Sequence, residues 1–83
     1  MQINLFYNEF TGEYLFNEKS EFTATGVSHD NIRKDLEELL NVMLYKFHHR
    51  RHMTVKCRLP EKDFEFARKY ISKFESKFNV ESD

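Results

Sequence analysis

The five-residue run HHRRH, at positions 48–52, holds the side chains in this chain that are best suited to chemistry. Histidine ligates metals and titrates near neutral pH, whereas arginine presents a planar fork of donors that matches phosphate. Lys46 stands just before the run, and Lys56 and Arg58 follow it closely. Three interpretations are therefore open: a metal site, a phosphate-binding surface, or the solvated end of a helix.

The metal interpretation begins from the spacing of His48 and His52, which are four residues apart. On a helix, this spacing places two imidazoles on one face, as in zinc-binding pairs. No third ligand is evident, because Cys57 is expected on the buried side of the following strand. The intervening arginines would also oppose a divalent cation. We therefore expect no metal and no cofactor.

The phosphate interpretation treats the whole basic segment as one patch, because phosphate recognition uses several cations in fixed geometry. Phe6, with Leu15 as a second candidate, is expected to share an open sheet face with the last cations of the segment. A ring beside cations on a sheet can stack single-stranded bases. The alternative is that these cations only complement a helix dipole and protect a sheet edge. The predicted patch comprises Lys46, His48, His49, Arg50, Arg51, His52, Lys56 and Arg58.

Charge is strongly segregated along the sequence, although the formal net charge is only −1. Residues 1–45 hold eight acids and three bases, whereas residues 46–58 hold five bases and no acid. The overall balance excludes a globally basic nucleic-acid binder. A local basic segment in an acidic chain is compatible with either a polyanion or an acidic protein surface as the partner.

Catalytic motifs are not evident. Cys57 is the only cysteine, and the two glycines, Gly12 and Gly26, are isolated, so neither a phosphate-binding loop nor a nucleophile elbow is present. A chain of 83 residues builds one small core and has little apolar material left for an enclosed pocket. The sequence therefore predicts a non-enzymatic protein.

The expected location is the cytoplasm. A lone thiol is typical of a reducing compartment and excludes a disulfide-stapled scaffold. The first residues lack a basic segment followed by an apolar one, which argues against a signal peptide. The longest apolar run is only Val42 to Tyr45, far too short for a bilayer span, so no membrane association is expected.

Hydropathy patterning predicts an α+β fold in the order β-β-β-α-β-α. Alternating apolar and polar residues indicate strands, and apolar residues at spacings of three and four indicate helices. The expected product is one domain, residues 1–78, with a small and mostly antiparallel four-stranded sheet, two helices packed on one face, and a frayed tail at 79–83. The strands are expected at 2–8, 13–17, 21–25 and 53–59, and the helices at 29–49 and 60–78.

Local signals support these boundaries. Gly12 suits the turn of a hairpin, and Ser28 is a natural N-cap for the first helix. Each helix has a single apolar stripe. The stripes comprise Ile32, Leu36, Leu39, Leu40, Met43 and Phe47 in the first helix, and Phe64, Ala67, Ile71, Phe74 and Phe78 in the second.

Aromatic residues are more numerous than so small a core requires, with nine phenylalanines and four tyrosines. Tyr45, Phe66 and Tyr70 fall beside the apolar stripes of their helices. Exposed aromatics among charged residues are typical of protein interfaces. These three residues are therefore the predicted protein-binding surface.

The leading hypothesis is a small non-catalytic protein-binding module that acts as a regulator or stoichiometric inhibitor of another protein or pairs with itself as a homodimer. Its abundance of lysine, glutamate, asparagine and phenylalanine is typical of accessory proteins of AT-rich bacteria and their phages. The alternative hypothesis is a nucleic-acid-binding module that uses the basic segment 46–58.

Overall fold

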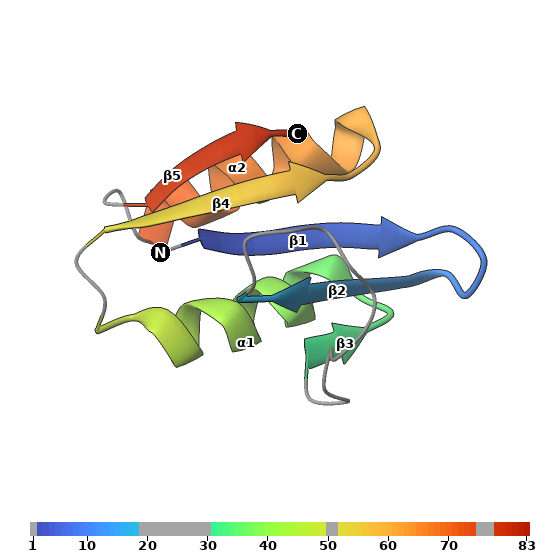
Figure 1. Cartoon of the computed structure of the whole chain (residues 1–83), viewed down its shortest axis with the longest axis horizontal. Coiled ribbons are helices and arrows are strands. Elements are labelled where there is room, and N and C mark those ends of the chain that lie inside the picture. Colours follow the sequence, from blue (N-terminus) through green and yellow to red (C-terminus); the bar gives the residue numbers. More distant parts are fainter. Residues whose placement is uncertain (1, 19–30, 50–51, 75–77) are drawn as a thin grey trace.

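The computed structural model describes residues 2–18, 31–49, 52–74 and 78–83 (Figure 1). These residues form two helices and one five-stranded sheet. Along the chain the elements are β1 (Gln2–Asn8), β2 (Glu13–Asn17), β3 (Ile32–Arg33), α1 (Leu36–Phe47), β4 (Met53–Arg58), α2 (Glu61–Phe74) and β5 (Phe78–Ser82). The predicted α+β class is confirmed.

The sheet is mixed, with strand order β3-β2-β1-β4-β5. β1 pairs antiparallel with β2, and β2 antiparallel with β3, whereas β4 runs parallel to both of its neighbours, β1 and β5. The expectation of four mostly antiparallel strands is therefore wrong. Each helix returns the chain to the end of the sheet where the previous strand began, so β4 and β5 both enter in the direction of β1.

The C-terminal segment was expected to continue α2 to Phe78 and then fray, and this is wrong. Helix α2 ends at Phe74, and Phe78–Ser82 forms the edge strand β5. Phe78 is buried in the core and Val80 packs against it, while Asn79 between them is exposed. This alternation with a period of two is what a strand with one face on the helical layer requires.

The start of α1 also differs from the expected one. The strand predicted at 21–25 and the predicted N-cap Ser28 lie outside the described residues. Ile32 and Arg33 pair with β2 as the short strand β3, so the helix cannot begin as early as His29. Asp35 is the N-cap, and its carboxylate accepts a hydrogen bond from the backbone N–H of Glu38 at 3.2 Å.

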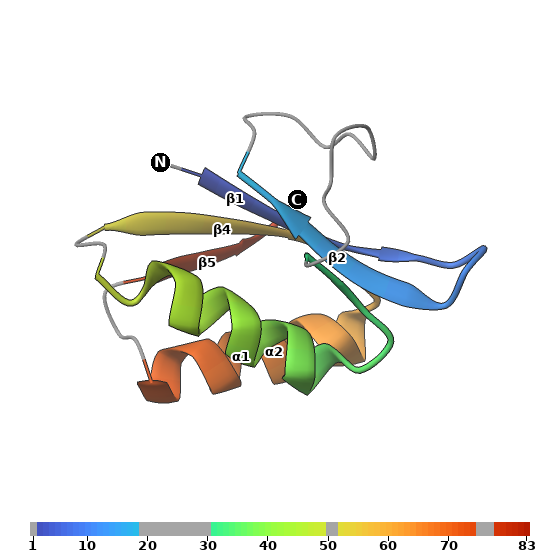
Figure 2. The same ribbon diagram turned by 90° about the horizontal axis from the view of Figure 1, so that it is seen from below.

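Both helices cover the same face of the sheet (Figure 2). The β1–β2 hairpin closes as predicted through Gly12, which has φ of 73° and donates its N–H to the carbonyl of Asn8 at 2.8 Å. Within the described ranges, no helix is long and apolar enough to cross a membrane. The core between the layers contains Ile3, Leu5, Phe16, Leu36, Leu39, Leu40, Met43, Leu44, Phe47, Met53, Val55, Cys57, Ala67, Ile71 and Phe78.

Candidate functional site

The face of the sheet away from the helices holds part of the predicted basic patch. Strand register places Phe6 beside both Leu15 and Arg58, so the predicted sharing of one sheet face is confirmed. The whole of this face had been expected to be open, but part of it is covered. Leu15 is buried, and the buried amide of Asn4 donates to Asn17 at 2.9 Å. The exposed part of the face therefore lies toward β4 and β5.

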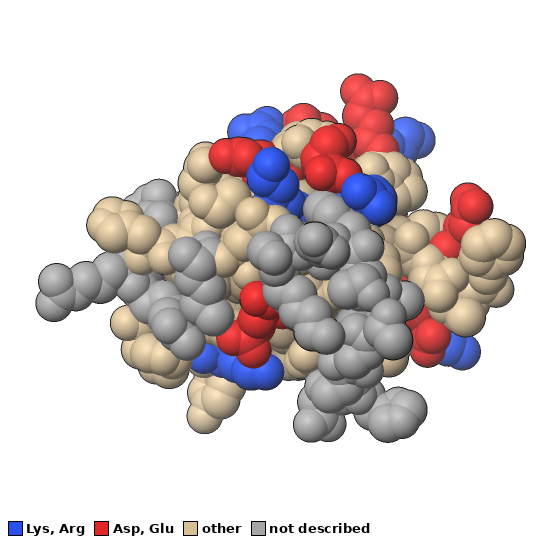
Figure 3. All heavy atoms as spheres, in the orientation of Figure 1, with Lys and Arg blue, Asp and Glu red and all other residues tan. Residues whose placement is uncertain are grey.

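The two cations on β4 face acids on β5. Lys56 Nζ lies 3.8 Å from Glu81 Oε1, and Arg58 donates through Nε and Nη2 to Asp83 Oδ2 at 2.8 and 2.6 Å. Lys56 and Glu81 are register partners on neighbouring strands. Acidic and basic side chains consequently alternate over this region rather than gathering by sign (Figure 3). An incoming phosphate would have to compete with carboxylates that are already in place.

Lys46 belongs to a different part of the molecule. It lies on α1, and its Nζ is 3.5 Å from Glu18, just after β2. The same ammonium lies 5.9 and 5.7 Å from the ring centroids of Phe16 and Phe47. β1 separates β2 from β4 in the sheet, so Lys46 does not join Lys56 in one patch.

His48 and His49 follow the end of α1, and His52 directly precedes β4. His48 Nδ1 is 2.6 Å from the carbonyl oxygen of Tyr45, and the rings of these two residues are 5.9 Å apart. His49 and His52 are exposed, and Arg50 and Arg51 lie outside the described residues. Among the residues that the structure describes, no group of three His, Cys, Asp or Glu side chains could hold a metal ion.

The predicted aromatic surface lies on the helices. Phe66, Tyr70 and Phe74 follow one another at intervals of four along α2, with ring centroids 5.6 and 5.0 Å apart. The Tyr70 hydroxyl donates to the side-chain oxygen of Asn41 on α1, which joins the two helices. Tyr45 lies one turn after Asn41. We call these five residues the aromatic face.

Exposure differs within the aromatic face. Tyr45 and Phe74 are 81% and 57% exposed, whereas Phe66 and Tyr70 are half-buried. Phe74 had been assigned to the core stripe of its helix, which is wrong, because the buried positions of α2 end at Ile71. The signal that would have found it is its spacing of four from Tyr70, which continues the row that starts at Phe66.

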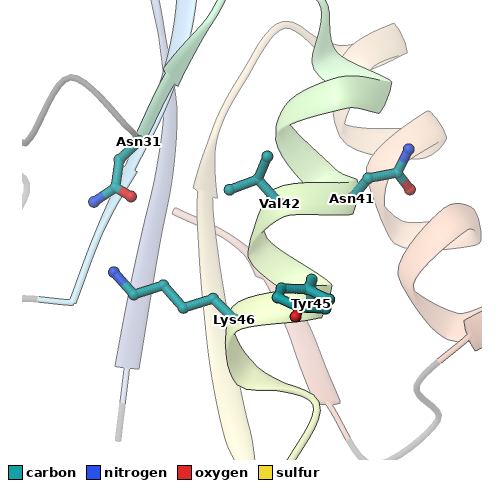
Figure 4. A pocket seen from close by; sticks show the side chains of 5 residues that line it. All are labelled: Asn31, Asn41, Val42, Tyr45 and Lys46. Atoms are coloured by element: carbon teal, nitrogen blue, oxygen red, sulfur yellow. The ribbon is translucent and has the colours of Figure 1, made fainter.

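An open recess of about 640 Å³ extends the aromatic face across α1 (Figure 4). Asn41 points toward α2, while Val42 and Lys46 point toward the side on which Asn31 lies. The described residues that line the recess are Asn31, Asn41, Val42, Tyr45 and Lys46. The recess thus adjoins the aromatic face at Asn41 and Tyr45 and extends across α1 toward Asn31.

Two side chains with shifted pKa values lie on the inner side of the sheet. Burial raises the pKa of the Cys57 thiol to about 12, which keeps it protonated at neutral pH. Burial, and then the hydrogen bond from its hydroxyl to Asp63 at 2.8 Å, raises the pKa of Tyr14 to about 12. Neither group is activated as a nucleophile, because each is held in its neutral form.

Comparison with known proteins finds no matching family model, no matching curated protein and no matching solved structure.

Proposed function

We propose that this protein is a small non-catalytic protein-binding module that acts as a regulator or stoichiometric inhibitor and contacts its partner through the aromatic face. The observation that carries the proposal is the exposure of Tyr45 (81%) and Phe74 (57%) next to Phe66 and Tyr70 on adjoining helices. Each of these rings offers a large contact area with few rotatable bonds, which is why aromatic residues dominate binding hot spots.

The hydrogen bond between Tyr70 and Asn41 supports this proposal, because it fixes the two helices at the centre of the aromatic face. The half-buried rings of Phe66 and Tyr70 then form a base on which the exposed ring of Phe74 is held. Preorganised side chains lose little conformational entropy on binding. The surface suits a partner that also has apolar side chains to bury.

Nucleic-acid binding is the weaker alternative. Lys56 and Arg58 each have a carboxylate within 4 Å, so much of their charge is already balanced. Lys46 is likewise paired with Glu18. The alternative therefore depends on Arg50 and Arg51, which lie outside the described residues.

The test is affinity capture from a native lysate with three immobilised chains, each assayed with and without nuclease. These are the wild type, a Tyr45→Ser, Phe74→Ser double variant, and Phe10→Ser. Phe10 is a matched control because it is 91% exposed at the turn of the hairpin, away from the helices. We expect the wild type and Phe10→Ser to retain the same partner after nuclease treatment.

The double variant should lose this partner while keeping the circular dichroism spectrum and melting temperature of the wild type. Two results contradict the proposal. One is a partner that the double variant retains, and the other is a partner that disappears from all three chains after nuclease treatment.

A further inference from the structure

The aromatic face lies between two opposite charges. Helices α1 and α2 run in the same direction (Figure 1), so their N-terminal halves share one end of the molecule. These halves, residues 36–41 and 61–67, hold five acids and one base, whereas residues 42–47 and 68–74 hold four bases and no acid. The acids are Glu37, Glu38, Glu61, Asp63 and Glu65, and the bases of the second halves are Lys46, Arg68, Lys69 and Lys73.

Several of these charges are not engaged in ion pairs. Glu37, Glu38, Glu61 and Lys69 are exposed and make no ion pair within the described residues. Lys73 lies over the ring of Phe74 at 5.7 Å. By contrast, Glu65 and Arg68 pair with each other at 2.8 Å. Lys46 is paired with Glu18, and Asp63 accepts from Tyr14 on the sheet side. The acidic end that faces solvent is therefore formed by Glu37, Glu38 and Glu61, and the basic end by Lys69 and Lys73.

From this arrangement we infer that a second copy of this chain occupies the aromatic face, related to the first by a two-fold axis that runs across the helices. The inference rests on the proposed function, because it names a partner for the same surface. Such an axis turns each helix antiparallel to its own copy. The acidic end of one helical layer then lies over the basic end of the other, and the aromatic faces meet in the middle.

Charge selects this arrangement over the parallel one. A two-fold axis running along the helices would stack acidic ends on acidic ends and basic ends on basic ends, and juxtaposed like charges oppose association. The antiparallel arrangement also opposes the helix dipoles of the two layers, each of which has its positive end at the N-terminus. With the axis beside Tyr70, Phe66 of one copy comes opposite Phe74 of the other.

The size of the surface sets the expected affinity. At 1.5 Å per residue, the 12 residues of α1 and the 14 residues of α2 are about 18 and 21 Å long. Two helices of this length offer a contact at the small end of specific interfaces. We therefore expect a dissociation constant in the micromolar range that rises with salt concentration, because exposed charges contribute to the association.

Complementary charge reversal on α2 provides the test. One variant carries Lys69→Glu with Lys73→Glu, and the other carries Glu61→Lys with Glu65→Lys. All four residues are exposed, and neither variant replaces a residue of the aromatic face, although Lys73→Glu removes the cation over the ring of Phe74. In each variant alone, positions 61, 65, 69 and 73 of α2 all carry the same sign, so these positions bring like charges together across the two-fold axis. In an equimolar mixture, both ends again bring opposite charges together.

Sedimentation velocity over a series of concentrations measures the outcome. We expect a wild-type dimer, at least tenfold weaker association of each variant alone, and recovery of the dimer in the mixture. Thermal melts of the two variants check that both are folded. A wild-type chain that stays monomeric at about 1 mM, well above the expected dissociation constant, overturns the inference, as does a mixture no more associated than its components.

Failure of the dimer and failure of the proposed function are distinguishable. A monomeric wild type that still captures a different protein, and loses it with Tyr45→Ser and Phe74→Ser, overturns only the dimer. A wild-type dimer that the Tyr45→Ser, Phe74→Ser double variant forms equally well overturns the placement of the second copy on the aromatic face.

Discussion

The two outer surfaces of this molecule, one on the sheet and one on the helices, differ in how their charged side chains are arranged. On the sheet, Lys56 and Arg58 of β4 face Glu81 and Asp83 of β5, so opposite charges meet within one protein. On the helices, apart from the local pair of Glu65 with Arg68, exposed acids lie at one end and exposed bases at the other, with aromatic rings between them. The first arrangement balances charge within the protein, while the second leaves several charges without an ion pair. We therefore expect the position of a cation relative to its nearest acid to matter more for binding than the local count of cations.

The largest expected effect is on the free energy of unfolding, and it should differ between substitutions on the buried and the exposed side of α2. Ile71 is fully buried, whereas Phe74, three residues later, is exposed. Ile71→Ala should lower the free energy of unfolding by about 2 to 5 kcal/mol, because it removes buried methyl groups and leaves a cavity. Phe74→Ser should lower it by less than about 1 kcal/mol. Urea unfolding measures both, and equal losses would show that Phe74 belongs to the core.

The next effect is a pH dependence of stability that comes from the inner side of β4, where Cys57 lies. Its pKa is raised from 9.0 to about 12 in the folded chain, so the stabilising effect of the neutral thiol is complete below pH 9 and is lost progressively as pH rises toward 12. By pH 10 this loss is on the order of 1 kcal/mol. Urea unfolding at pH 8 and pH 10 measures it.

Cys57→Ala provides the control for this pH dependence. The variant should be less stable than the wild type at pH 8, because it leaves a small cavity, but its stability should change less between pH 8 and pH 10. An unchanged pH dependence would assign the effect to other groups, with Tyr14 as the first candidate because its pKa is also raised.

A third prediction tests the balanced charge of the sheet directly. Glu81→Gln with Asp83→Asn removes the carboxylates that face Lys56 and Arg58. If these carboxylates are what limits phosphate binding, affinity for a mixed-sequence oligonucleotide should rise by about three- to tenfold and depend more steeply on salt. Fluorescence anisotropy at two salt concentrations measures this change.

Glu37→Gln with Glu38→Gln is the matched control, since it changes net charge equally at acids that make no ion pair within the described residues. An equal gain in both double variants would mean that overall charge, rather than local pairing, governs oligonucleotide binding.

The smallest effect concerns the strength of the ion pairs themselves. A double-mutant cycle on Arg58 and Asp83 should give a coupling energy of about 0.5 kcal/mol, because solvent screens exposed pairs. The cycle on Lys56 and Glu81 should give less, since their contact is longer, at 3.8 Å. A coupling several times larger would show that these pairs contribute substantially to the stability of the β4–β5 edge.

Local patterns in the sequence predicted the first hairpin with its observed bounds, because alternation and Gly12 each depend on neighbouring residues only. They did not predict β5, because Phe78 also fits the helical spacing of α2 and strand pairing with β4 is not a local property. The basic segment was taken as one patch because the pairing of its cations with distant acids is not a local property either. Asp83 lies 25 residues from Arg58, and no sequence pattern connects them.

The position of the aromatic residues on the helices was predicted more successfully, while their role in binding stays a prediction. Tyr45, Phe66 and Tyr70 lie beside the helical stripes, and the angular position of a residue on a helix can be derived from its number alone. Phe74 was wrongly assigned to the core. The apolar stripe indicates which side of the helix a side chain is on, but it does not indicate where along the helix the sheet stops covering that side.

The parallel pairing of β1 with β4 has a consequence for the time that the chain takes to fold during synthesis. Leu5 meets Phe16 of β2 only 11 residues later, but Ile3 meets Val55 of β4 after 52 residues. At about 5 to 20 residues per second, the ribosome needs roughly 2 to 9 seconds to extend the chain from the end of β1 to the start of β4. Throughout that interval, the edge of β1 that pairs with β4 in the folded protein has no strand beside it.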